Sequence, residues 1–105
     1  MATLRIYGEV YCDYRDEMAD CGDIYFINSV TGDTSIACVS DNGEYEIYLN
    51  EGKYDFFARV VRKDGTTTWY QSGWYDHDGS GGGSHEQDID ANTSGAWRNV
   101  CDCEN

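Results

Sequence analysis

The sequence predicts an all-β fold, a sandwich of about seven or eight short strands. Three observations predict it. Apolar and polar residues alternate strictly in several windows, turn residues recur about every eight to twelve positions, and no window keeps a 3.6-residue period. The chain has 105 residues, of which 40% are hydrophobic and 14% aromatic, so it can form a packed core. That length suits one domain, residues 1–105.

The opening segment, residues 1–12, is the clearest expected strand. Alternate positions along it are apolar or small and would face the core: Leu4, Ile6, Gly8, Val10 and Cys12. A polar stretch, residues 13–20, follows and breaks the pattern. Because the strand is terminal and is followed by polar residues, it could fill its own sheet or complete the sheet of another copy.

The other strands follow from alternation between turn residues. They are expected at 23–29 with Ile24 and Phe26 inward, 34–39, 44–49, 54–60, 66–75 with a bulge at Gly73, 85–91 and 96–103. Glycine-containing turns separate them: Thr31-Gly32-Asp33, Asp41-Asn42-Gly43, Asn50-Glu51-Gly52 and Lys63-Asp64-Gly65. Asn42-Gly43 is a hairpin signal, which predicts pairing of the strands on either side of it. The glycine-rich segment within residues 76–85 is expected to be a flexible loop.

Four segments between about residues 4 and 62 follow a known pattern. They are Gly8-Glu9-Val10, Thr31-Gly32, residues 40–47 and residues 49–56, the last two each placing a tyrosine two positions after a turn glycine. These segments resemble the carboxypeptidase regulatory-like (transthyretin-like) domains. The resemblance implies an Ig-like or transthyretin-like β-sandwich and a non-catalytic structural, surface-exposed or carbohydrate-associated role. The Trp-rich strand, the glycine-rich loop and the Cys-bearing tail depart from the family pattern, so the resemblance implies nothing about them.

The charge of the chain excludes several partners. Twenty acidic residues against seven basic ones give a net charge of −13. Nucleic acids and anionic lipids would be repelled by such a surface, so no nucleic-acid partner is expected. Membrane insertion is not expected either, because no apolar run is long enough to span a bilayer.

Five cysteines suggest a disulfide-bonded protein of an oxidising compartment, which is extracellular or at a cell or virion surface. Cys12 and Cys21 flank a polar loop and could form a disulfide staple. Cys38 could then bond Cys101 or Cys103, and the remaining cysteine could bond another subunit. The alternative is five reduced thiols in a cytosolic protein.

The glycine-rich loop begins like a calcium-binding loop. Asp76, Asp78 and Ser80 occupy the first three ligand positions, and Gly81 the bend. The twelfth position holds Gln87 instead of the bidentate glutamate, although Asp88 could close a looser site. No cofactor other than calcium is expected, and a solvated loop is the alternative. His77 and His85 at the two ends of the loop could share zinc, but a flexible loop is a poor zinc site.

Three tryptophans could stack on sugar rings: Trp69, Trp74 and Trp97. The alternative is that they belong to the core. Asn92-Thr93-Ser94 is an acceptor sequence for N-glycosylation. No nucleophile motif appears, and carboxylate pairs carry little information in so acidic a chain, so we expect no enzyme.

Two functions are compatible with these residues. The first is a structural subunit of an extracellular homopolymeric filament, a pilus-like fibre or a virion appendage. Copies of the chain would be joined by donor-strand exchange of the first strand, with Leu4, Ile6 and Val10 anchoring each link. The second is a monomeric extracellular module that binds carbohydrate or calcium.

Overall fold

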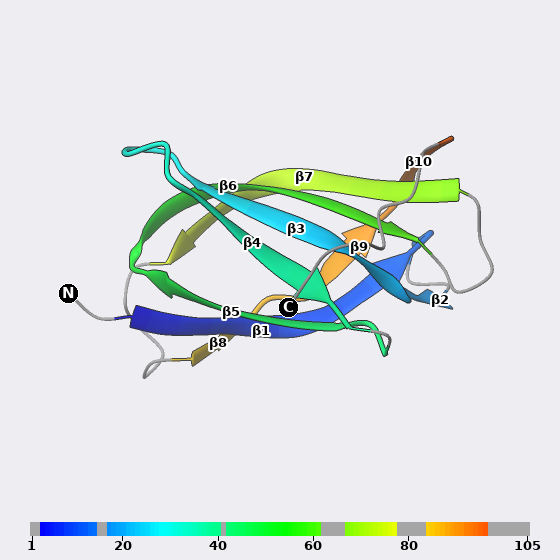
Figure 1. The fold of residues 1–105 in the computed structure, drawn as a ribbon, viewed down its shortest axis with the longest axis horizontal. Helices are drawn as coiled ribbons and strands as arrows, with labels where there is room; N and C mark the ends of the chain where they lie inside the picture. Colours follow the sequence, from blue (N-terminus) through cyan, green and yellow to red (C-terminus); the bar gives the residue numbers. More distant parts are fainter. Residues whose placement is uncertain (1–2, 15–16, 41, 62–66, 78–83, 97–105) are drawn as a thin grey trace.

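The computed structural model describes residues 3–14, 17–40, 42–61, 67–77 and 84–96, and its regular elements there are all β-strands (Figure 1). They form two packed sheets, so the expected all-β sandwich is confirmed. The small sheet contains β1 (Thr3–Cys12), β2 (Glu17–Met18), β5 (Glu44–Asn50), β8 (Ser84–Glu86) and β9 (Ile89–Ala91). The large sheet has the order β10 (Thr93–Ala96), β7 (Thr67–His77), β6 (Gly52–Val61), β3 (Cys21–Asn28), β4 (Thr34–Val39). Among the described residues there is no helix that could cross a membrane.

The core lies between the two sheets and follows the alternation of the sequence. The small sheet contributes Ile6 and Val10, which are fully buried, and the large sheet contributes Ile24, Phe26 and others. The ring of Phe26 links the layers, because it stacks on Tyr45 of β5 and tilts against Phe56 of β6, with ring centroids 6.3 Å apart in both pairs.

The turn at Asn42-Gly43 does not close a hairpin, so that expectation is wrong. Gly43 has the expected positive φ, +77°. However, β4 pairs with β3 in the large sheet, while β5 pairs with β1 in the small sheet. The physical reason is that β1 binds this segment: the Val10 amide donates to the Gly43 carbonyl at 2.7 Å. The chain therefore crosses from one layer to the other at this turn, and it crosses back between β5 and β6.

Gly73 does not form a bulge either. The pairing of β6 with β7 runs without interruption from Gly52↔His77 to Val61↔Thr68. A Cβ at Gly73 would lie 3.0 Å from the ring of Phe56, the residue opposite it. The glycine therefore makes room for an aromatic ring within a regular ladder.

The ends of the expected elements differ in detail from the structure. The expected strand at 85–91 is divided into β8 and β9, and the polar stretch 13–20 contains the two-residue strand β2. The last described strand, β10, lies at Thr93–Ala96, and all but the first residue of the expected strand at 96–103 lies outside the described residues. The expected turn at 63–65 and most of the glycine-rich loop lie outside the described residues.

Candidate functional site: the slot of the first strand

The first strand fills a gap one strand wide. On one edge β1 pairs antiparallel with β5 from Thr3↔Asn50 to Glu9↔Glu44, and further along with β2. On its other edge it pairs parallel with β8 and then with β9. In the described part of the chain, β5 pairs with neither β8 nor β9. Figure 1 shows β1 between these strands, and we call the gap that it fills the β1 slot.

Apolar side chains hold β1 in this slot. Ile6, Val10 and Cys12 are each 0% exposed and belong to the core. Burial of the first two contributes roughly 3–6 kcal/mol in all. These residues confirm the inward face expected from the sequence. Leu4 pairs with Leu49 along the backbone, and its side chain lies outside the described ones.

The segment between β8 and β9 holds the backbone of β1 closely. The Gln87 amide donates to the Tyr7 carbonyl at 2.7 Å, and the Glu9 amide donates to the Asp88 carboxylate at 2.9 Å. The hydroxyl of Tyr45 on β5 donates to the Gln87 carbonyl at 2.6 Å, which joins the two walls of the slot. The slot is therefore shaped by backbone and side-chain contacts from β5, β8 and β9.

The connection between β1 and β2 is strained. Its first two residues, Asp13 and Tyr14, have φ values of 59° and 58°, although neither is glycine. A left-handed conformation costs roughly 1–2 kcal/mol for an ordinary L-residue. Tyr14 is also exposed, so packing of its ring does little to offset this cost. We call residues 13–16 the hinge, of which the structure describes the first two. Aspartate is tolerated in this conformation, so Asp13 is a weak signal for it, whereas nothing in the sequence indicates it at Tyr14.

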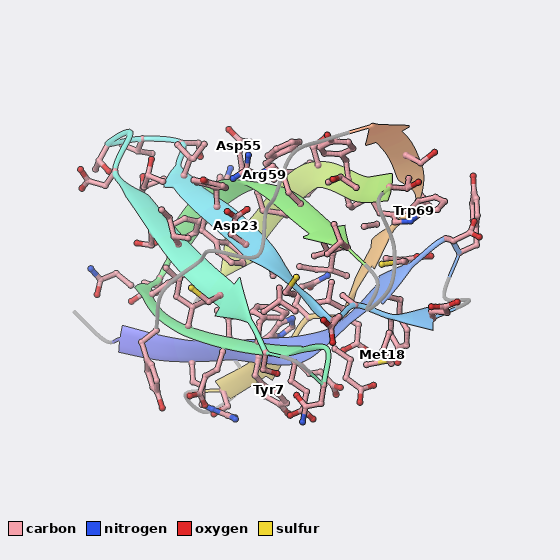
Figure 2. The ribbon with its side chains drawn as sticks, turned by 45° about the vertical axis from the view of Figure 1, so that its right-hand side comes forward. Tyr7, Met18, Asp23, Asp55, Arg59 and Trp69 are labelled. Carbon is pink, nitrogen blue, oxygen red and sulfur yellow. The ribbon has the colours of Figure 1, made fainter. Side chains whose placement is uncertain are left out.

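The outer face of the large sheet, which points away from the core, carries an ion pair that the sequence analysis missed. Arg59 donates to both carboxylate oxygens of Asp23, at 3.0 and 2.8 Å, and to the hydroxyl of Tyr25 at 3.1 Å. Figure 2 shows Asp23 and Arg59 side by side on this sheet, with Tyr7 across the molecule at the small sheet. The hydrogen bonds to Asp23 raise the pKa of Arg59 above its ordinary value, since they favour the charged form. Only the register, Asp23↔Arg59, brings the two together.

The three candidate sugar-binding tryptophans do not form one strip. Trp74 is 74% exposed on the outer face of the large sheet, whereas Trp69 is turned inward and packs against the core. Trp97 lies outside the described residues. The outer face also carries partly exposed apolar groups: Ile27, Ile36, and Phe57 stacked on Tyr70. Of the three tryptophans, Trp74 is thus the one that the described structure leaves accessible to a ligand.

An acidic groove of about 600 Å³ is lined by residues of β1 and β5 in the small sheet and by Cys38 and Ser40 at the end of β4. Its charged lining residues are Arg5, Glu9, Glu44, Glu46 and Glu86. Arg5 pairs with Glu46 and lies over the ring of Tyr7, 4.2 Å from its centroid. The hydrogen bond to Glu46 raises the pKa of Arg5. The groove is acidic overall, as the composition of the chain predicts.

The residues proposed for calcium are spread over the fold. Asp76 lies in β7 of the large sheet, while Asp88 accepts a hydrogen bond from the backbone of β1 in the small sheet. Asp78 and Ser80 lie outside the described residues. Within the described ranges, no group of three or more His, Cys, Asp or Glu side chains could hold a metal ion. Asn92 lies between β9 and β10, partly exposed, where a glycan stays a prediction.

The expected disulfide between Cys12 and Cys21 is wrong. Cys12 is a thiol buried in the core, because it continues the inward face of β1. Cys21 and Cys38 are both disulfide-bonded, which confirms the expectation that Cys38 is oxidised. Cys101 and Cys103 lie outside the described residues. The length of the polar loop between Cys12 and Cys21 does not reveal that Cys12 faces the core while Cys21 faces away from it.

Comparison with known proteins does not assign a function to this chain. No family model and no curated protein matches this chain. The resemblance to carboxypeptidase regulatory-like domains stays a prediction. Because one sandwich fold serves many functions, a function has to be argued from particular sites.

Proposed function

We propose that this protein is the structural subunit of an extracellular homopolymeric filament, a pilus-like fibre or a virion appendage, whose copies exchange their first strands. The observation that carries the proposal is the β1 slot. The first described strand fills a one-strand gap between walls that do not pair with each other in the described structure. The same gap in one copy can accept β1 from the next.

The energetics of exchange favour this use of the slot. A donated β1 makes the same hydrogen bonds and buries the same Ile6 and Val10 as the chain's own β1, so these contributions cancel between the two states. Two differences remain: the strain of the hinge, which favours exchange, and the lost freedom of associating copies, which opposes it and matters less as the chain becomes more concentrated. Because Tyr14 adopts a left-handed conformation in the closed chain, extension of the hinge would release roughly 1–2 kcal/mol there, and less at Asp13, since aspartate tolerates this conformation better. Short strained hinges favour such exchange over closed monomers.

Head-to-tail donation produces an open polymer. Each copy gives its β1 to one neighbour and receives β1 from the other, so the contact joins two different surfaces and does not close on itself. The acidic surface suits a fibre in water because it limits sideways association. The oxidised Cys21 and Cys38 support an oxidising environment.

Sedimentation velocity and negative-stain imaging of the purified chain test this function. We expect fibres or a ladder of polymers at micromolar concentration. A single species at the chain mass of 11.8 kDa over a wide concentration range, including after slow cooling from partial unfolding, would refute the proposal. Closed dimers would support strand exchange but contradict the filament.

A second candidate is a monomeric extracellular module that binds carbohydrate, and Trp74 favours it. Its side chain is exposed on the outer face of the large sheet, and Asp55, an acceptor for sugar hydroxyls, lies opposite it in β6. Screening labelled oligosaccharides against the chain, with Trp74→Ala as the variant and Trp74→Phe as the matched control, tests this candidate. We expect a bound sugar to be lost with alanine and largely kept with phenylalanine. Failure of every oligosaccharide to bind would refute it.

A further inference from the structure

The inner face of the large sheet becomes polar at one end of the sandwich. Asn28 of β3 pairs with the buried Tyr54, so it faces the space between the sheets. Ser35 of β4 faces the same space, because it pairs with the buried Phe26. Gly52 comes two positions before Tyr54 in β6 and therefore lies on the same face. An amide, a hydroxyl and bare backbone thus occupy positions where the alternation would continue an apolar core.

These residues border a cleft of about 640 Å³. Figure 1 shows the β3–β4 turn and the β5–β6 turn at the same end of the molecule, and residues of both turns line the cleft. The lining also includes the buried Leu49 and Tyr54. A Cβ at Gly52 would lie 3.5 Å from Asn28 Nδ2 and 3.8 Å from the ring of Tyr54, so any side chain there would take up part of this space. Sites for small molecules have volumes of about 300–1,000 Å³, a range that includes this cleft.

Hydrogen bonds hold the two turns against each other. Ser29 donates from its amide and from its hydroxyl to the Lys53 carbonyl, at 2.9 Å in both cases. Asn28 Oδ1 accepts hydrogen bonds from two amides of its own turn, at 2.9 and 3.0 Å, so its Nδ2 donor is the end that approaches Gly52. A cleft that is already shaped in this way loses little conformational freedom when a ligand binds.

The lining offers the groups by which proteins recognise sugars. Tyr48 of β5 is 60% exposed, and its ring can stack on the C–H face of a pyranose. Asp33 and Glu51 supply carboxylate acceptors, while Lys53 and Asn28 supply donors. With two carboxylates beside one lysine, the lining would repel an anionic ligand. Within the ranges that the structure describes, no group of three or more potential ligand side chains could hold a metal ion.

We propose that this cleft binds a neutral sugar, a pyranose residue of a glycan, whose ring stacks on Tyr48 and whose hydroxyls bond the polar side chains around it. Such a ligand needs donors and acceptors beside an apolar ring face, and the cleft provides both. None of the lining residues belongs to β1, and Trp74 does not line the cleft. The inference therefore depends neither on strand exchange nor on a sugar at Trp74. In a filament each copy would present the cleft once, and many weak sites together would strengthen attachment.

Saturation-transfer NMR of the native chain tests the inference, because it detects weak binding to a monomer and to a polymer alike. The probes are the methyl glycosides of glucose, galactose, mannose and N-acetylglucosamine. We expect at least one of them to bind with millimolar affinity, and binding by none would overturn the inference. Sedimentation of the same samples separates this failure from a failure of the filament, because polymers form or do not form whether or not a sugar binds.

Two variants locate the bound sugar. We expect Tyr48→Ala to weaken binding about tenfold and Tyr48→Phe, the matched control, to keep it, because the ring makes the stacking contact. Ser35→Leu places an apolar side chain between the layers, so binding should be lost while the melting temperature is kept. Unchanged binding in Tyr48→Ala or in folded Ser35→Leu would place the sugar elsewhere and overturn the inference. Because Tyr48 is exposed, its variants should fold, and they decide the result alone if Ser35→Leu does not fold.

Discussion

Gly8 of β1 lies against the Gln87 carbonyl so closely that a Cβ at Gly8 would come within 2.4 Å of the carbonyl oxygen. The contact comes from backbone, which cannot swing aside as a flexible side chain can. The glycine in the middle of the opening strand is therefore needed for β1 to enter its slot. The same limit applies whether β1 comes from its own chain or from a neighbour.

Substitution of Gly8 by alanine tests how tightly the slot fits. We expect Gly8→Ala to lower the free energy of unfolding by about 3 kcal/mol, because β1 or the segment at Gln87 has to shift. The measurement is the denaturant midpoint at unchanged slope. Gly32→Asn is the control, since a Cβ there meets nothing within 4 Å and asparagine tolerates a positive φ. Equal losses in the two variants would show that the slot is not tight.

Relief of strain at the hinge should shift the assembly equilibrium. We expect Tyr14→Gly to favour the closed monomer, because glycine adopts a φ of 58° at little cost. Tyr14→Phe keeps the strain and serves as the control. Sedimentation at a fixed concentration should show fewer polymers for the glycine variant than for the phenylalanine variant. The same distribution for both would mean that hinge strain does not drive exchange.

The Asp23–Arg59 pair should matter to stability more than the Arg5–Glu46 pair. In Asp23→Asn the guanidinium of Arg59, whose side chain is 22% exposed, loses its charged partner, at a cost of about 2 kcal/mol. Glu46→Gln on the exposed small-sheet face is the control, and we expect little change there. Thermal unfolding of both variants measures the difference, and a larger loss for Glu46→Gln would contradict this ranking.

The raised pKa of Arg59 fixes how this contribution depends on pH. Because pairing favours the protonated guanidinium in the folded state, the contribution is fully present below the ordinary pKa of arginine and is lost only as pH rises through the raised pKa. We therefore expect Arg59 to add no slope to the stability of the chain in neutral or mildly alkaline solution. A steep loss there that disappears in Arg59→Gln would contradict this.

Reduction of the disulfides at Cys21 and Cys38 should lower the stability of the fold. Cys12 should not contribute to this loss. We expect a thiol reductant to lower the free energy of unfolding by about 2–5 kcal/mol for each bond broken at Cys21 or Cys38. Cys12→Ala should lose roughly 1 kcal/mol through a small cavity but keep the same response to reductant. If the response disappears in Cys12→Ala, the assignment of Cys12 as a buried thiol is wrong.

Alternation along the chain predicts most of the strands, because a half-buried strand needs an apolar residue at every second position. It places Ile6, Val10, Ile24 and Phe26 correctly in the core. It cannot assign strands to sheets, so it predicts a hairpin at Asn42-Gly43 where the chain in fact changes layers. Which residues pair across strands depends on register, and register is set by the packing of the whole fold.

The candidate site is predictable in one respect and hidden in others. The length and pattern of the opening strand indicate its importance. The approach of Gln87 to Gly8 joins segments far apart in the sequence, and nothing in the residue type of Tyr14 indicates its left-handed conformation. The outward positions of Cys21 and Cys38, opposite to that of Cys12, likewise require the register of β3 and β4.

Zero-length cross-linking across the β1–β5 ladder tests strand exchange most directly. Arg5 of β1 forms an ion pair with Glu46 of β5, and both side chains are accessible, so in Arg5→Lys a carbodiimide can join the new amine to the Glu46 carboxylate as an amide with loss of water. The same substitution combined with Glu46→Gln is the control. If β1 is exchanged, a reducing denaturing gel will show a ladder of covalent multimers that the control lacks. If the linked product stays at the mass of one chain and carries the amide between positions 5 and 46 internally, β1 belongs to its own sheet and the filament proposal is refuted.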